Sequence, residues 1–129
     1  MMEITDSFRH MGLRMQLVKE LRDKGIKNEK VLKAIAELPR HLFMDQAFLK
    51  FAYQDKAFPI GCEQTISQPY TVAFQTELLE VKPYEKVLEV GTGSGYQAAV
   101  LVALKAQVFT IERQKELYTR TKNFLPKIG

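Results

Sequence analysis

Apolar residues recur in the first part of the chain with the spacing of an amphipathic helix. The spacing predicts a helix over residues 5–24, with Thr5 or Asp6 as its N-cap and Gly25 at its C-terminal cap. Its predicted core face consists of Phe8, Met11, Met15, Val18 and Leu21. We expect this helix to be a packing element.

Two more helices are predicted between residues 28 and 80. Asn28 can cap a helix through EKVLKAIAEL, and Pro39 stops it. Another helix is expected from Pro69 to about Glu80, because proline suits the first helical position. Residues 40–66 show no clear period, and we interpret them as packing against the domain rather than as an aromatic binding cage. The aromatic residues of this segment are Phe43, Phe48, Phe51, Tyr53 and Phe58.

The pattern changes after KPYE, residues 82–85. Two apolar runs, KVLEV and QVFTIE, predict strands, and a helical stretch follows each of them. The order strand–helix–strand–helix predicts parallel strands, a right-handed crossover and an α/β sheet.

Composition and charge narrow the class of protein. The 129 residues, 46% apolar and 26% charged, suit one globular domain and exclude a disordered chain. No apolar run is long enough for a membrane span, and the start MMEITDSFRHM has no apolar signal core. The single cysteine, Cys62, allows no internal disulfide and favours a cytoplasmic location. The net charge of +4 is mild, and the basic stretch RQKELYTRTK reads as a solvated helix face, so we expect no nucleic-acid partner.

The loop GTGSG between the first strand and its helix indicates a ligand site. Its glycines, Gly91, Gly93 and Gly95, permit unusual backbone angles and let a ligand approach the main chain. A phosphate loop would need a lysine after Gly95, and a dinucleotide loop would need glycine in place of Tyr96. The spacing from Glu89 onward, Glu-x-Gly-x-Gly-x-Gly, instead resembles the S-adenosylmethionine loop of class I methyltransferases.

Two acidic residues fit a cationic nucleoside ligand. Glu89 lies beside the loop, where it suits a sulfonium and an ammonium, although it also reads as a solvated loop acid. Glu112 ends the second strand, where it can accept hydrogen bonds from ribose hydroxyls or simply cap the next helix. Cys62 is interpreted as a bystander. With only His10 and His41 beside it, we expect no metal site.

Three stretches together closely resemble the protein-L-isoaspartate (D-aspartate) O-methyltransferase family. They are PIGCEQTISQPYTVAFQTELL, VLEVGTGSGYQAAVL and VFTIER, and the resemblance extends to LPRHLF and FAYQD. The chain departs from the family pattern at Glu63, where glycine is expected just before QTIS.

The resemblance implies an enzyme of protein repair. Such an enzyme transfers a methyl group from S-adenosylmethionine to the α-carboxyl of L-isoaspartyl residues, so isoaspartyl-containing proteins and peptides would be its partners. Ser67 would be the catalytic residue that positions the substrate carboxylate, although it also reads as a helix cap. The residues expected to bind the cofactor are Gln64, Thr65, Ile66, Ser67, Glu89, Gly91, Thr92, Gly93, Gly95 and Glu112.

The resemblance also implies a domain organisation. We expect a helical, substrate-side segment over residues 1–80 and the first half of a Rossmann-like cofactor-binding domain over residues 81–129. The fold would be a truncated methyltransferase fold with its first two parallel strands, inactive alone. The alternative is a non-catalytic nucleotide-binding module that self-associates, and in either case we expect a homo-oligomer through the open sheet.

Overall fold

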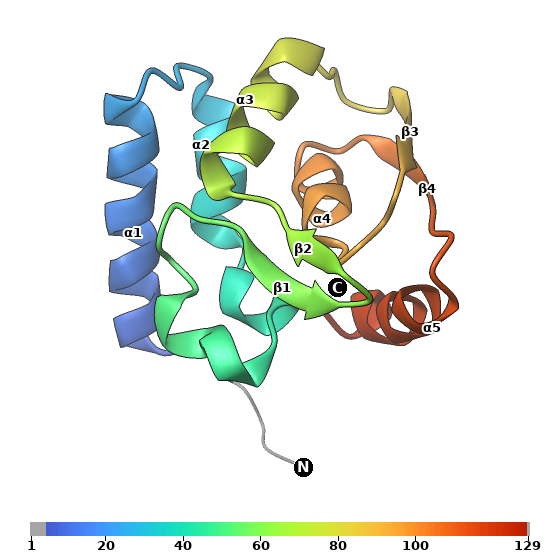
Figure 1. Ribbon diagram of the computed structural model, residues 1–129. Coiled ribbons are helices and arrows are strands. Elements are labelled where there is room, and N and C mark those ends of the chain that lie inside the picture. The colour runs from blue at the N-terminus through green and yellow to red at the C-terminus, as the bar shows by residue number, and fades with distance from the viewer. Residues whose placement is uncertain (1–4, 129) are drawn as a thin grey trace.

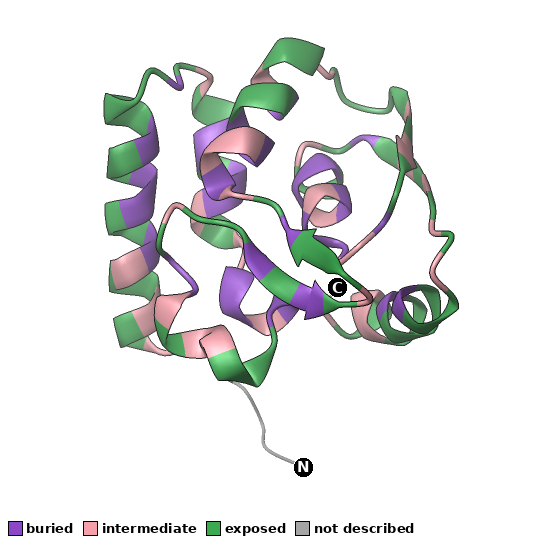
Figure 2. Cartoon of the chain, in the orientation of Figure 1, coloured by how far each residue is buried: buried purple, intermediate pink, exposed green. Residues whose placement is uncertain are grey.

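The computed structural model describes residues 5–128 and has an α/β architecture (Figure 1). In chain order the elements are α1 (Phe8–Asp23), α2 (Glu29–Glu37), the 3₁₀ helices η1 (Arg40–Phe43) and η2 (Gln46–Phe51), β1 (Phe58–Gly61), β2 (Gln64–Ile66), α3 (Pro69–Leu79), β3 (Lys86–Val90), α4 (Tyr96–Ala103), β4 (Gln107–Ile111), α5 (Lys115–Phe124) and the 3₁₀ helix η3 (Leu125–Ile128). Helix α2 contacts α1, α3 and α4, and α4 in turn contacts β4. The core therefore runs from α1 through α2 to α4 and α5, which contribute Val100 and Leu117 (Figure 2).

The predicted parallel pair is confirmed. Strands β3 and β4 pair in register, with Leu88 opposite Phe109 and Val90 opposite Ile111. These four side chains are between 55% and 77% exposed, and we call them the open sheet face. Within residues 5–128 neither strand pairs with a third, so both outer edges also keep free backbone groups.

Helix α1 is rotated relative to the prediction. Ser7, not Thr5 or Asp6, is its N-cap, and its side chain accepts a hydrogen bond from the His10 N–H. Phe8, Met11 and Met15, which were assigned to the core face, are 90%, 40% and 58% exposed. The face that packs inward is instead formed by Arg14, Leu17, Val18 and Leu21. The predicted end is correct, since Gly25 has a left-handed φ of 106° just after the helix.

The other two predicted helices have the expected boundaries. The Asn28 side chain accepts hydrogen bonds from two N–H groups at the start of α2, which ends before Pro39. Helix α3 runs from Pro69 to Leu79, and its C-cap Glu80 closes the helix with a left-handed conformation. The carboxylate of Glu77 binds the N–H groups of Lys27 and Asn28 at 2.7 and 2.6 Å, which joins α3 to the start of α2.

The aromatic segment packs against the domain, as expected. Phe43, Tyr53 and Phe58 are buried. Phe48 and Phe51 lie on Phe58, with ring centroids 5.7 and 6.4 Å away.

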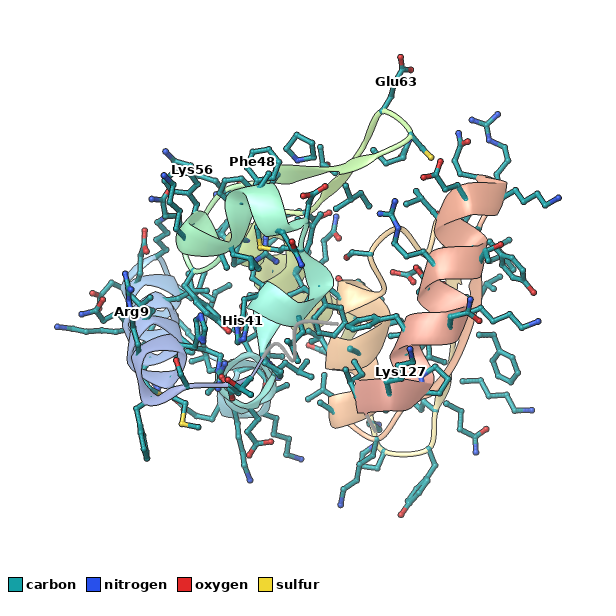
Figure 3. All side chains as sticks on the ribbon, turned by 90° about the horizontal axis from the view of Figure 1, so that it is seen from below. Arg9, His41, Phe48, Lys56, Glu63 and Lys127 are labelled. Carbon is teal, nitrogen blue, oxygen red and sulfur yellow. The ribbon has the colours of Figure 1, made fainter. Side chains whose placement is uncertain are left out.

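This segment also contains a hairpin that the pattern did not predict. Strands β1 and β2 pair antiparallel, with Gly61 opposite Gln64. Between them Cys62 and Glu63 both have left-handed φ angles, 52° and 56°. This is a two-residue mirror-image turn, in which glycine is normally preferred. It explains why glycine is the expected residue at Glu63, whose side chain points away from the body at the tip of the hairpin (Figure 3).

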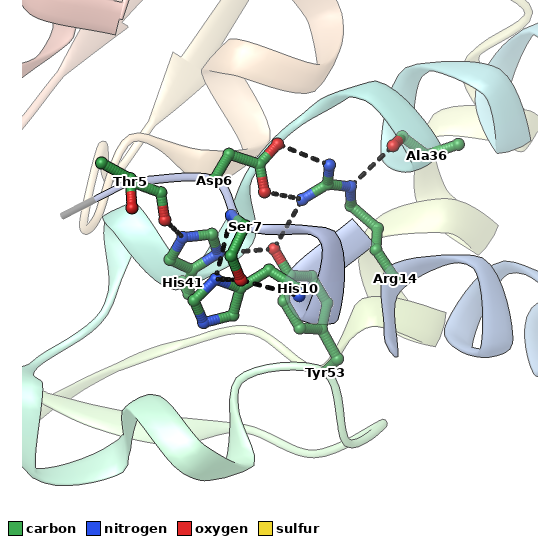
Figure 4. A network of polar contacts seen from close by, with 8 residues as sticks. All are labelled: Thr5, Asp6, Ser7, His10, Arg14, Ala36, His41 and Tyr53. Carbon is green, nitrogen blue, oxygen red and sulfur yellow. Dashed lines mark hydrogen bonds and ion pairs between the residues drawn. The ribbon is translucent and has the colours of Figure 1, made fainter. Parts of the chain in front are cut away.

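A polar network fixes α1 to the aromatic segment (Figure 4). The guanidinium of Arg14 is paired with Asp6 at 2.8 Å and donates to the Tyr53 hydroxyl at 2.8 Å. His41 is fully buried, and its Nδ1 lies 2.7 Å from the same hydroxyl. The ring of His10 stacks on His41 with a centroid separation of 3.8 Å. Arg14 can be buried because each nitrogen of its guanidinium donates a hydrogen bond. The burial of Arg14 accounts for the rotation of α1 relative to the prediction.

The network resembles a metal site only in its composition. Ligand atoms of Asp6, His10 and His41 lie within 4.8 Å of one another. However, the two imidazole rings are nearly parallel, at 16°, so an ion in the plane of one ring lies outside the plane of the other. The carboxylate is also occupied by Arg14. The arrangement is a stacked pair of rings rather than a set of ligands.

We predict that stability falls when the pH drops below about 6.5, the usual pKa of a free imidazole. Burial, and then the neighbouring His10, hold the pKa of His41 below that value, with Asp6 opposing and Arg14 reinforcing the shift. Between the two pKa values the unfolded chain binds the extra proton, so acidification favours unfolding until His41 is protonated in the fold as well. Urea denaturation at pH 7.5 and 5.5 measures the loss, and His41→Gln should reduce it. An equal loss in both proteins would contradict the assignment.

Candidate functional site

Three segments that are far apart in the sequence meet around one small pocket. They are the end of β2 with the start of α3, the loop after β3, and the first turn of α4. The pocket encloses about 70 Å³. Its lining consists of Thr65, Ile66, Ser67, Val72, Glu89, Gly91, Thr92, Gly93, Ser94, Tyr96 and Gln97.

Most of the predicted site residues are thus brought together. Those that line the pocket are Thr65, Ile66, Ser67, Glu89, Gly91, Thr92 and Gly93. Gln64, Gly95 and Glu112 were predicted but do not line it. Tyr96 and Gln97 were not among the predicted residues, although their position directly after the third glycine was the available signal.

The three glycines of the loop have different surroundings. Their φ angles are 94°, 55° and 84° at Gly91, Gly93 and Gly95, all in the left-handed region. A Cβ added at Gly91 would meet nothing within 4 Å, and one at Gly93 only Ile60 at 3.7 Å. A Cβ at Gly95 would come within 2.9 Å of Leu125. The first two glycines therefore leave backbone open to the pocket, whereas the third allows close packing against η3.

Glu112 holds the glycine loop in place. One carboxylate oxygen accepts a hydrogen bond from the Gly93 N–H at 2.8 Å, and the other accepts one from the Gln114 N–H at 2.9 Å. These hydrogen bonds, first that from Gln114 and then that from Gly93, lower the pKa of Glu112. The carboxylate is therefore ionised at neutral pH, and it lies at the end of β4 beside the loop. Gln114, not Glu112, occupies the N-cap position of α5, so Glu112 joins the predicted ligand loop to the residue that precedes the helix.

Glu89 lies between the sheet and the pocket. Its carboxylate accepts a hydrogen bond from the Thr110 hydroxyl at 2.7 Å, and that hydroxyl is 2.6 Å from the hydroxyl of Thr92. Burial raises the pKa of Glu89, and the hydrogen bond from Thr110 opposes the shift. A partly desolvated carboxylate of this kind interacts strongly with a cationic ligand group placed in the pocket.

Ser67 presents an exposed side chain at the opposite wall of the pocket. Its hydroxyl makes no hydrogen bond within residues 5–128, and Gln68, not Ser67, occupies the N-cap position of α3. The N–H groups near the start of α3 were expected to be free, but that of Tyr70 donates to Asp55 at 2.8 Å. The carbonyl of Ser67 accepts a hydrogen bond from Arg40 at 2.9 Å. The serine backbone is therefore fixed while its hydroxyl remains available.

Cys62 has no features of a nucleophile. It lies in the hairpin turn, where its Sγ is 3.4 Å from a carboxylate oxygen of Glu116. Desolvation and then this carboxylate raise the pKa of the thiol, which disfavours the reactive thiolate. Among residues 5–128, no helix is long and apolar enough to cross a membrane.

Comparison with known proteins identifies the family. The profile of the Protein-L-isoaspartate(D-aspartate) O-methyltransferase (PCMT) family matches residues 13–129. The chain belongs to this family. The Protein-L-isoaspartate O-methyltransferase of Christiangramia forsetii is 68% identical over 124 residues, which are 96% of this chain and 58% of the relative. That of Flavobacterium johnsoniae is 62% identical over the same shares. The chain thus spans less than two thirds of the length of these relatives.

Solved structures confirm the fold. A protein-L-isoaspartate O-methyltransferase aligns with a TM-score of 0.80 and 29% identity, over 90% of this chain and 39% of that chain. A putative enzyme of the same name from Plasmodium falciparum, in complex with S-adenosyl-L-homocysteine, aligns with a TM-score of 0.73 and 22% identity, over 88% and 55%. The predicted Rossmann-like methyltransferase fold, represented by its first two parallel strands, is therefore correct.

We predict opposite effects of the same added methyl group at two glycines. Gly93→Ala places a side chain at a left-handed φ of 55° and should cost about 1–2 kcal/mol of stability. Gly12 lies in the exposed part of α1, where an added Cβ would meet nothing within 4 Å. Gly12→Ala should therefore add about 0.5–1 kcal/mol of stability. Thermal unfolding of both variants measures the difference. If Gly93→Ala were as stable as the parent protein, the loop would not need its left-handed conformation.

Proposed function

We propose that the protein is an S-adenosylmethionine-dependent protein-L-isoaspartate O-methyltransferase, which acts on isoaspartyl residues of damaged proteins and peptides. The observation that carries this proposal is the family match over residues 13–129. The pocket supports it, because the QTIS segment and the glycine loop contribute opposite walls.

The pocket residues fit one end of S-adenosylmethionine. The open backbone at Gly91 and Gly93 accommodates close approach, and Glu89 supplies negative charge toward the cationic sulfonium and ammonium. Thr65, Ile66 and Thr92 complete the lining. The volume of about 70 Å³ is well below the ~300 Å³ of a small ligand pocket, so these residues would hold only part of the cofactor. When bound, the cofactor supplies the electrophilic methyl group.

The remaining predicted contacts are at the rim. We assign Glu112 to the ribose hydroxyls, which would share its carboxylate with the Gly93 N–H. Gln64 is the exposed first residue of β2, and we assign it to the same side of the cofactor. Gly95 would act through the position of α4, since it is buried against Leu125.

Ser67 would position the substrate. An isoaspartyl α-carboxylate is ionised at neutral pH, so methyl transfer requires no general base. The chain has to hold the acceptor oxygen in line with the methyl group, and orientation of this kind is worth several kcal/mol, up to about 7–11. The exposed Ser67 hydroxyl, which has no partner within residues 5–128, is available to donate a hydrogen bond to that carboxylate.

The same proposal assigns a role to each part of the chain and a cellular location to the protein. Residues 1–80 would form the substrate side, and residues 81–129 the first half of the cofactor side. The single cysteine supports a cytoplasmic location.

The decisive test joins the chain to the remaining C-terminal part of the Christiangramia forsetii relative. This chimera should transfer tritiated methyl groups to an isoaspartyl peptide and not to the matching aspartyl peptide, whereas the 129-residue chain alone should be inactive. Ser67→Ala in the chimera should lower turnover about 10-fold or more with little change in cofactor affinity, because the hydroxyl is assigned to the substrate. Equal labelling of both peptides, or of neither, would refute the repair function.

We also propose that the chain self-associates through the open sheet face. Leu88, Val90, Phe109 and Ile111 form a continuous apolar surface on two strands, and a second copy can cover it with the same surface. Sedimentation velocity should find a dimer or larger assembly, and Phe109→Thr should shift it toward monomer. Phe8→Thr, which removes a more exposed phenyl ring from α1 (90% against 56% for Phe109), should not. A monomeric parent protein would rule out this association.

A further inference from the structure

Arg40 is a buried cation whose hydrogen bonds, in the described part of the chain, all go to uncharged carbonyl groups. It begins η1, directly after Pro39, and its side chain is fully buried. Within residues 5–128 it forms no ion pair, and burial lowers its pKa. Even a paired buried ion gives little net stability, and an unpaired one gives less. A residue kept only for stability would be better replaced by an apolar side chain, so the arrangement of its contacts requires another explanation.

The guanidinium binds three carbonyl groups of the segment that leads to the pocket. Its Nε donates to the carbonyl of Ala52 at 3.1 Å. Its Nη2 donates to the carbonyls of Lys56 and Ser67 at 3.3 and 2.9 Å. One rigid planar group therefore fixes the backbone on both sides of the β1–β2 hairpin.

The other side of Arg40 contacts the opposite wall of the pocket. Its Cζ lies over the ring of Tyr96, 4.9 Å from the centroid. Tyr96 is the first residue of α4, directly after the glycine loop, and it is 1% exposed. Phe43 packs edge-on against the same ring at 5.3 Å. Arg40 therefore lies behind the pocket, between the wall that carries Ser67 and the wall that carries the glycine loop.

We propose that Arg40 is a positioning residue that sets the separation between Ser67 and the glycine loop. It lines no part of the pocket, and acts through the Ser67 carbonyl on one side and the Tyr96 ring on the other. The Nη1 of Arg40 and the hydroxyl of Tyr96 have no hydrogen-bond partner in the described part of the chain. Packing of the guanidinium on the Tyr96 ring therefore joins the two walls. The consequence for cofactor affinity rests on the proposed function, but the positioning itself does not.

Arg40→Lys tests the proposal because it retains the charge and removes the plane. A lysine offers one nitrogen, which cannot reach three carbonyls and stack on Tyr96 at once. Arg14→Lys is the matched control. Arg14 is equally a buried arginine, bound to the Ala36 carbonyl at 2.6 Å and to Tyr53, but neither it nor these partners line the pocket. Both variants should be less stable than the parent protein.

Hydrogen exchange of the 129-residue chain distinguishes positioning from stability. In Arg40→Lys, the amides of residues 64–66 and those of Gly95 and Ala99 should exchange at least about tenfold faster, while the amides of α2 change only with global stability. The last two are protected in the parent protein by 2.9 Å bonds to Thr92 and Gly95. Arg14→Lys should leave these amides at their parent rates after the same correction. A uniform increase across the chain, or the same pattern in both variants, would overturn the proposal.

Two further measurements complete the test. If Arg40→Lys does not fold, Arg40→Met removes the buried charge altogether and should show the same local increase in exchange at both walls; no local increase would overturn the proposal. Titration with S-adenosylhomocysteine, followed by amide chemical shifts, should show at least about tenfold weaker binding in the Arg40 variant and binding within twofold of the parent in Arg14→Lys. Absence of binding by the parent chain would refute the cofactor assignment, and the exchange data would still decide the role of Arg40.

Discussion

The parallel pairing of β3 and β4 is the constraint on which the candidate site depends. Because the strands run in the same direction, their carboxyl ends meet at one edge of the sheet, and the groups that follow each strand become neighbours. The ladder continues past the strand ends, where the N–H groups of Gly91 and Thr92 both donate to the Ile111 carbonyl at 2.8 and 3.1 Å. This brings Glu112 within reach of the Gly93 N–H. An antiparallel pair would separate the glycine loop from that carboxylate by the length of the sheet.

Buried polar groups that are far apart in the sequence join α1, the aromatic segment and the wall of the pocket that carries Ser67. Arg14, His10, His41 and Tyr53 connect α1 with the aromatic segment, and Arg40 connects that segment with the carbonyl of Ser67. Such groups stabilise only when each has its partner, so they favour one arrangement of the elements more strongly than an apolar core of the same size would. The open sheet face is the opposite case, since its apolar side chains are on the surface and have no partner within the described residues.

Where the sequence pattern acts locally, it predicts the structure well. The strands, the helices that follow them and the caps at Asn28 and Gly25 depend on neighbouring residues, and each lies where the pattern places it. The rotation of α1 could not be found in this way, because Arg14 is buried by partners as distant as Tyr53. The same limit applies to the site. The two motifs predicted which residue types form the site. They did not predict that the glycines have different roles, because those roles depend on η3, whose Leu125 leaves no room for a side chain at Gly95.

The mirror-image turn at Cys62 and Glu63 has a consequence for the order of folding. Non-glycine residues resist the left-handed conformation, and the flanking strands span four and three residues, so the hairpin is unfavourable by itself. It is closed from outside, by Arg120, which donates to the Ile60 carbonyl at 2.6 Å across 60 positions of sequence. We therefore expect the hairpin to form late, after α5 has docked. The candidate cofactor contacts of β2, Gln64 to Ile66, would then be the last part of the pocket to take shape.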